Sequence, residues 1–185
     1  MNQDQIKQLN EAVEAVKTRK IENVYFVACG GSKAIFDPAQ FIFDRETTLP
    51  SFVYNANEFI HRCPKGLGEN SLVVTCSHSG NTLETTRATQ LAGDKGALTI
   101  SFSYRVDSPL WKATQHPISY VWGPESNPGD NNNGMLYRLV FSILNVLQPN
   151  EKYERAIKAC DNLGKVYEAN KAKFAESAKA FGKKY

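Results

Sequence analysis

Five short apolar segments, each followed by residues with helical character, restrict the fold of this chain more than any other feature. They are residues 24–29, 51–54, 72–76, 97–102 and 118–122. Strands of a parallel sheet read as continuous apolar runs because helices cover both faces of the sheet. Strands that alternate with helices imply parallel pairing through crossover connections. The sequence therefore predicts an α/β fold, a three-layer αβα sandwich around a five-stranded parallel sheet in the order 2-1-3-4-5.

Helical patterns fill the segments between these strands. Residues 3–20 are polar with apolar residues at helical spacing, which predicts an amphipathic helix. Further helices are expected over residues 36–43, 58–62 after a cap at Asn57, 83–91, 109–112 after a cap at Ser108, and 135–147. A last amphipathic helix is expected within residues 151–185. Residues 1–150 should form one domain, to which this last helix is added.

Residues 77–82 form a hydroxyl-rich turn between the third predicted strand and a helix, and we call them the 77–82 turn. The free N–H groups and the dipole of a helix N-terminus favour an anion. The hydroxyls of Ser77, Ser79 and Thr82 can donate to anion oxygens, and Gly80 lets the backbone come close. The turn has no lysine, which suits a phosphate monoester better than a polyphosphate with magnesium. The alternative is a Ser/Thr helix cap, but a cap needs only one hydroxyl.

A second turn of similar composition follows the first predicted strand. This turn consists of Gly30, Gly31 and Ser32, and a helical segment begins at Lys33. Lys33 either adds positive charge to an anion site or is solvated. In a flavodoxin-like sheet of order 2-1-3-4-5, strands one and three are neighbours at the switch point, where ligands bind. The two turns are therefore expected to line one crevice.

Composition and charge exclude several classes of function. Residues 1–150 have a net charge of −1, and the positive excess lies in the last helix. The chain therefore lacks the basic stripe that is typical of nucleic-acid-binding proteins. No apolar run approaches the length of a membrane span, and the N-terminus does not resemble a signal peptide. The four cysteines show no CxxC spacing, so we expect reduced thiols in a cytoplasmic protein, without metal or disulfide.

With both turns identified, residues 24–147 resemble the sugar isomerase (SIS) family of phosphosugar-binding domains. Residues 77–82 match the family motif Ser-x-Ser-Gly-x-Thr, and the chain looks closest to the first half of fructoselysine 6-phosphate deglycases and of the isomerase part of glucosamine-6-phosphate synthase. The resemblance implies an SIS-type fold and a part of a sugar-phosphate isomerase or deglycase without cofactor. It also implies that a sugar phosphate is held by Gly31, Ser32, Ser77, His78 through its backbone, Ser79, Gly80 and Thr82.

The catalytic residues are not assigned by the sequence. Isomerase and deglycase chemistry needs a base beside a carbonyl or imine, and the weak candidates are Glu58, His78 and Glu125. The resemblance implies that the base of two-domain relatives lies in a second SIS half. This chain is thus expected to be such an N-terminal half or a short paralogue, which binds a sugar phosphate but turns it over poorly or not at all.

Two other functions stay open, together with the partners of the chain. It could be a phosphosugar-sensing module without catalysis, or a single-SIS enzyme completed by a neighbouring subunit. The apolar face of the last helix predicts a homo-oligomer or contact with a second SIS domain, and the alternative is that this face packs within the chain. His61 and His116 are interpreted as ordinary polar residues, and Trp111 and Trp122 as core residues.

Overall fold

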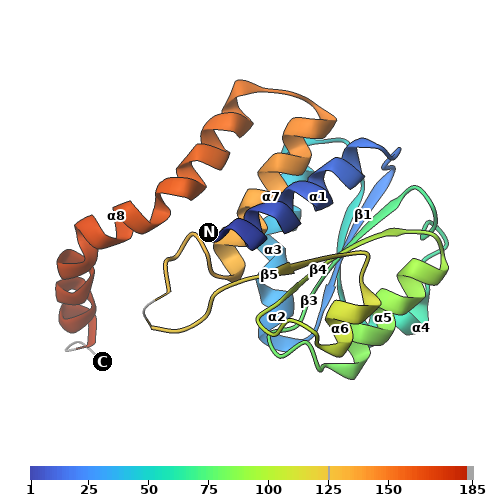
Figure 1. The fold of residues 1–185 in the computed structure, drawn as a ribbon, viewed down its shortest axis with the longest axis horizontal. Coiled ribbons are helices and arrows are strands. Elements are labelled where there is room, and N and C mark those ends of the chain that lie inside the picture. The colour runs from blue at the N-terminus through green and yellow to red at the C-terminus, as the bar shows by residue number, and fades with distance from the viewer. Residues whose placement is uncertain (125, 183–185) are drawn as a thin grey trace.

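The computed structural model describes residues 1–124 and 126–182, with a five-stranded parallel sheet at its centre (Figure 1). The order of the strands is β2-β1-β3-β4-β5, which confirms the predicted sheet. The strands are β1 (Asn23–Ala28), β2 (Ser51–Asn55), β3 (Ser71–Cys76), β4 (Leu98–Ser103) and β5 (His116–Ser119).

Helices cover both faces of this sheet and form the two outer layers. On one face α1 and α3 pack against α7, and on the other α5 packs between α4 and α6. The helices are α1 (Gln3–Lys17), α2 (Gly30–Ala34), α3 (Phe36–Glu46), α4 (Ala56–Arg62), α5 (Leu83–Asp94), α6 (Pro109–Ala113), α7 (Asn132–Leu147) and α8 (Glu151–Gly182). None of the described helices combines the length and the apolarity needed to cross a membrane.

The alternation of side chains along the strands divides the core into two clusters. On β1, Phe26 joins the larger cluster under α1, α3 and α7, whereas Tyr25 and Val27 join the smaller cluster under α4 and α5. The Phe26 ring lies 5.3 Å from the ring of Phe36 and 5.7 Å from that of Phe43. Because helices bury both faces, every residue of β3 and β4 is buried, which explains their continuous apolar pattern.

The fifth strand lies two residues earlier than the predicted residues 118–122. β5 pairs with β4 from His116 to Ser119, and Pro117 is tolerated because this strand is at the sheet edge. The chain then leaves the ladder, and the Val121 N–H donates to the Asp130 carbonyl over 2.8 Å. The expectation of a core position is wrong for Trp122, which is 55% exposed.

Helix ends differ from the prediction where a different residue provides the cap. Asn55, not Asn57, caps α4, and its side chain accepts from the Asn57 N–H at 3.0 Å. Asn131 caps α7, which therefore starts three residues earlier than predicted. The predicted cap at Ser108 is confirmed, because its hydroxyl accepts from the Trp111 N–H at 3.3 Å.

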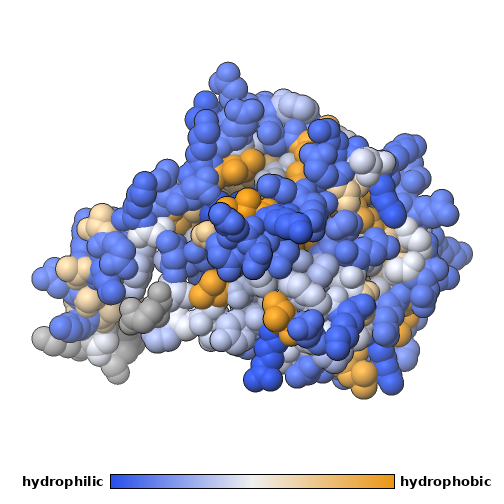
Figure 2. Space-filling view, in the orientation of Figure 1, coloured by the Kyte–Doolittle hydropathy of each residue, from blue (hydrophilic) through white to orange (hydrophobic). Residues whose placement is uncertain are grey.

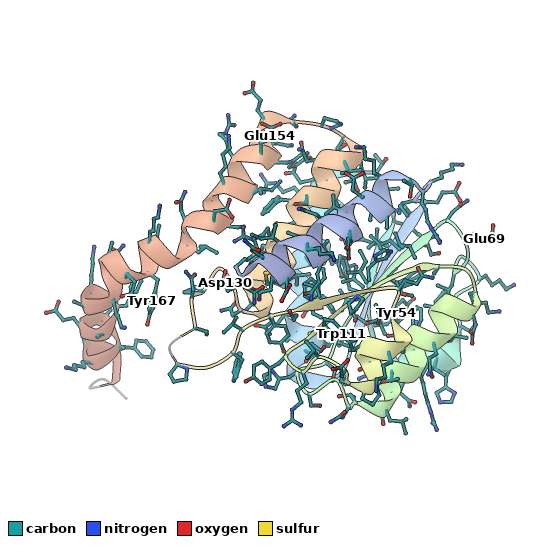
Figure 3. The ribbon with its side chains drawn as sticks, viewed as in Figure 1. Tyr54, Glu69, Trp111, Asp130, Glu154 and Tyr167 are labelled. Carbon is teal, nitrogen blue, oxygen red and sulfur yellow. The ribbon has the colours of Figure 1, made fainter. Side chains whose placement is uncertain are left out.

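The long helix α8 packs against α7 only along its first part. Tyr153, Cys160 and Gly164 are buried there, whereas Phe174 is 50% exposed further along the helix. Figure 1 shows α8 leaving the body of the domain, with Tyr167 on its outer part in Figure 3. Figure 2 shows apolar side chains among the charged ones on this outer part. Self-association through α8 stays a prediction.

Candidate functional site

The two turns lie next to each other at the carboxyl ends of β1 and β3. Ala28, the last residue of β1, pairs with Cys76, the last residue of β3. The 77–82 turn begins immediately after Cys76 and leads into α5. This is the switch point of the sheet, because β1 connects outward to β2 whereas β3 continues to β4 on the other side.

Backbone hydrogen bonds from three later residues hold the 77–82 turn in place. The Ser77 N–H donates to the Phe102 carbonyl over 3.1 Å, and the His78 carbonyl accepts from the Tyr104 N–H at 3.1 Å. The Gly80 carbonyl accepts from the Leu110 N–H at 3.0 Å. The turn is therefore fixed by β4 and α6 before any ligand arrives, which limits the entropy lost on binding.

Several hydrogen-bond donors of this turn have no acceptor among the residues that the structure describes. Thr82 is the N-cap of α5, but its side chain does not cap the helix and instead shares a 2.8 Å hydrogen bond with the Ser77 hydroxyl. Within residues 1–124 and 126–182, the N–H groups of His78, Ser79 and Thr82 have no acceptor. The alternative of an ordinary Ser/Thr cap thus does not describe Thr82, and the free N–H groups belong to a turn that leads into a helix N-terminus, where an anion is favoured.

Gly80 is required by both the conformation and the packing of the turn. Its φ of +68° lies in the left-handed region that side chains disfavour. A Cβ atom at this position would overlap the side chain of Ser108, the residue that caps α6. Trp111, labelled in Figure 3, marks this short helix beside α5. The glycine therefore lets the turn and the start of α6 approach each other.

The glycine-rich turn after β1 is helical from Gly30, so α2 begins three residues earlier than predicted. Gly30 and Gly31 are exposed, and a Cβ atom on Gly31 would meet no other atom within 4 Å. Ser32 is half-buried and lies close to the Cys76 thiol. Lys33 forms an ion pair of 3.8 Å with Asp37. The binding role of Gly31 and Ser32 stays a prediction.

His78 is held in a group of aromatic rings that sequence reasoning missed. Its Nδ1 shares a 2.8 Å hydrogen bond with the Tyr120 hydroxyl. Its ring stacks on Tyr104 at a centroid distance of 5.3 Å and an angle of 5°, and meets Trp122 edge-on at 5.1 Å. Tyr104 directly follows β4 and Tyr120 directly follows β5. Position after a strand end is the signal that could have identified them.

The other catalytic candidates are not brought together with the turn. Glu58 is exposed on α4 and forms a 2.9 Å ion pair with Arg62. Glu125 lies outside the described residues. His61 is exposed. His116 lies at the start of β5, so it is at the opposite end of the strands from the turn. It is half-buried, and this burial lowers its pKa. A catalytic role for Glu58, His78 or Glu125 stays untested.

Cys76, between the two turns, is expected to be chemically inert in the folded protein. Complete burial raises the pKa of its thiol to about 12, and the nearby Ser32 hydroxyl opposes this only in part. At pH 8 the thiolate fraction, and with it the alkylation rate, should be on the order of 1000-fold lower than for an ordinary cysteine. Mass spectrometry after brief alkylation should find label on the half-buried Cys63 and none on Cys76. Equal labelling of the two would contradict the buried position.

Comparisons with known proteins agree on one family. The SIS domain family matches residues 17–147. The chain is 46% identical over 178 residues to the fructosamine deglycase FrlB of Bacillus subtilis, covering 96% of this chain and 54% of that protein. It is 34% identical over 108 residues to the fructoselysine 6-phosphate deglycase of Escherichia coli, covering 58% of this chain and 32% of that protein.

Solved structures show the same fold. A phosphosugar isomerase candidate from Bacillus subtilis matches with a TM-score of 0.89 and 46% identity, over 96% of this chain and 54% of that one. Another from Salmonella typhimurium matches with a TM-score of 0.88 and 31% identity, over 98% of this chain and 55% of that one. The chain thus spans about half the length of these relatives.

Proposed function

We propose that this chain, which belongs to the SIS domain family, binds a sugar phosphate with the phosphate on the 77–82 turn. The observation that carries the proposal is the turn before α5, where the helix N-terminus has no side-chain cap and the N–H groups of His78, Ser79 and Thr82 have no acceptor among the described residues. A phosphate monoester supplies acceptor oxygens and the negative charge that a helix N-terminus favours.

The hydroxyls of the turn complete the phosphate site. Ser79 is half-buried at the turn, with its oxygen accepting from the Asn81 N–H at 3.2 Å, so its proton can be donated to a ligand. Thr82 and Ser77 share one hydrogen bond, which leaves one of the two hydroxyl protons for the phosphate. Gly31 and Ser32, on the neighbouring turn, are proposed to contact the same ligand.

The substrate is proposed to be a sugar phosphate that is linked to an amine, and the reaction its cleavage by a deglycase. The 46% identity to a fructosamine deglycase over 96% of the chain supports this substrate above a simple sugar phosphate. Such a reaction needs proton removal next to an imine to give an enolamine. The residues of this chain bind the phosphate and orient the sugar, and the base comes from a second SIS half or a neighbouring subunit.

Removal of two hydroxyls tests the phosphate site. Ser79→Ala with Thr82→Ala should weaken binding of fructose 6-phosphate about 100-fold or more, because two hydrogen bonds to a charged group are lost. For the unchanged protein, ligand at 100 times Kd should add roughly 2.7 kcal/mol of stability, which a thermal-shift titration detects.

A single hydroxyl at the opposite end of the strands provides the control. The Thr18 hydroxyl donates to the Ala15 carbonyl over 3.0 Å, after α1 and before β1. Thr18→Ala therefore removes a comparable hydrogen bond without touching the turn or the residues that hold it, and should leave affinity for the ligand unchanged. If the double variant binds fructose 6-phosphate as tightly as the unchanged protein, the phosphate does not lie on this turn.

A further inference from the structure

An exposed aromatic surface adjoins the phosphate turn, and the proposed phosphate site does not use it. It consists of the rings of His78, Tyr104 and Trp122, which we call the aromatic platform. Tyr104 is 45% exposed and Trp122 is 55% exposed. Large aromatic side chains are normally buried, so two half-exposed rings around a histidine indicate a contact surface.

The platform is rigid although it faces solvent. The His78 ring is fixed by its stacking on Tyr104 and by the 2.8 Å hydrogen bond from Nδ1 to the Tyr120 hydroxyl. Tyr120 is only 3% exposed, and burial raises the pKa of its phenol, so it stays protonated as a hydrogen-bonding partner at neutral pH. The Tyr104 N–H also donates to the His78 carbonyl. A surface that needs no reordering is suited to binding a ligand.

The position of the platform relative to the phosphate turn suggests its ligand. The phosphate donors lie after β3, next to β1, whereas Tyr104 follows β4 and Trp122 lies beyond β5. Neighbouring strands are about 4.8 Å apart, so the end of β4 lies about 5 Å from the end of β3. The Trp122 ring lies 5.1 Å from the ring of His78, which belongs to the turn. When the phosphate of a hexose phosphate is bound at the turn, the carbon chain of the sugar is long enough to span this distance to the platform. Trp122 also borders a hollow of about 390 Å³ with Pro124 and Asn131, which leaves room for a substituent.

We propose that the aromatic platform binds the amine-derived group at the end of the sugar opposite the phosphate. This inference rests on the proposed function and names the second half of the same substrate. The faces of aromatic rings carry negative partial charge and attract an ammonium nitrogen, and they also pack against the methylene groups next to it. The exposed faces of Tyr104 and Trp122 are therefore the groups that would contact the amine substituent.

A pair of ligands that differ only in the amine separates the platform from the phosphate site. The two probes are fructoselysine 6-phosphate and fructose 6-phosphate, titrated against the full chain by calorimetry. Trp122→Leu keeps an apolar side chain but removes the ring, and should lower the affinity for fructoselysine 6-phosphate about 3- to 30-fold. The affinity for fructose 6-phosphate should not change. Trp122→Phe retains a ring face and should recover most of the lost affinity.

A fluorescence signal and a control variant make the test specific to this surface. In a Trp111→Phe background, Trp122 is the only tryptophan of the chain, and its emission should change with the amine-linked probe and not with fructose 6-phosphate. Phe52→Leu removes another part-exposed ring, one that stacks on Tyr25 at 5.4 Å at the far edge of the sheet. It should leave both affinities unchanged.

The outcomes distinguish this inference from the proposed function. If Trp122→Leu leaves the affinity for fructoselysine 6-phosphate intact, or lowers both affinities equally, the platform does not bind the amine while the phosphate site stands. If the unchanged chain binds neither probe, the proposed function fails and the inference fails with it. Selective loss of the amine-linked probe supports both.

Discussion

Purified alone, the 185-residue chain should bind an amine-linked sugar phosphate and turn it over poorly or not at all. Proton abstraction needs a base beside the reacting carbons, and we propose that this base comes from a second SIS half or a neighbouring subunit. On α4, Glu58 is exposed and paired with Arg62. We therefore expect turnover at least 1000-fold below a typical enzyme rate of about 1–10 per second.

The measurement is release of free amine from fructoselysine 6-phosphate over hours at high protein concentration. The Bacillus subtilis fructosamine deglycase, of which this chain covers 54%, is the positive control in the same assay. Turnover by the chain at about 1 per second or faster would show that the base lies within it. Glu58, His78 and Glu125 would then be tested first, by single substitution to Gln or Ala.

Gly80→Ala should destabilise the protein by about 2–5 kcal/mol. The left-handed φ of +68° costs an alanine about 1–2 kcal/mol, and the overlap of the new methyl group with Ser108 costs about 1–3 kcal/mol more. Relief of the overlap would displace the cap of α6 and the turn together, so affinity for sugar phosphate should fall as well. Urea denaturation followed by circular dichroism measures the first effect.

Gly31→Ala is the matched control for stability. Gly31 has no left-handed φ, and its added methyl group would meet nothing within 4 Å. Alanine is the better helix former by about 1 kcal/mol, so this variant should be as stable as the unchanged protein or slightly more stable. Equal stability of the Gly80→Ala and Gly31→Ala variants would mean that the turn adapts to a side chain at residue 80.

The elements that the sequence predicts well are those whose signal is local. β3 and β4 are buried along their whole length, so their apolar runs mark them clearly. The switch point followed from strand order, because the order alone places the ends of β1 and β3 side by side. The hydroxyl-rich composition of the 77–82 turn likewise indicated an anion site before its backbone geometry was considered.

The features that escaped prediction depend on contacts between distant residues. The aromatic group around His78 is assembled from the ends of three strands, and although Tyr104 and Tyr120 each follow a strand, their contact with His78 depends on the packing of those strands. The apolar character of residues 120–122 was interpreted as a strand, although only Tyr120 is buried and Trp122 lies at the surface. Ser108 has a second role besides capping α6, because its side chain packs directly against Gly80.

The backbone bonds that complete the 77–82 turn have a consequence for protein synthesis. The turn depends on carbonyl and N–H groups of Phe102, Tyr104 and Leu110, which leave the ribosome after it. A nascent chain that ends at α5 would contain all six residues of the turn but none of these three bonds from later residues. Tight capture of sugar phosphate would then require that β4 and α6 have docked, and so would mark a stage of co-translational folding that precedes the addition of β5.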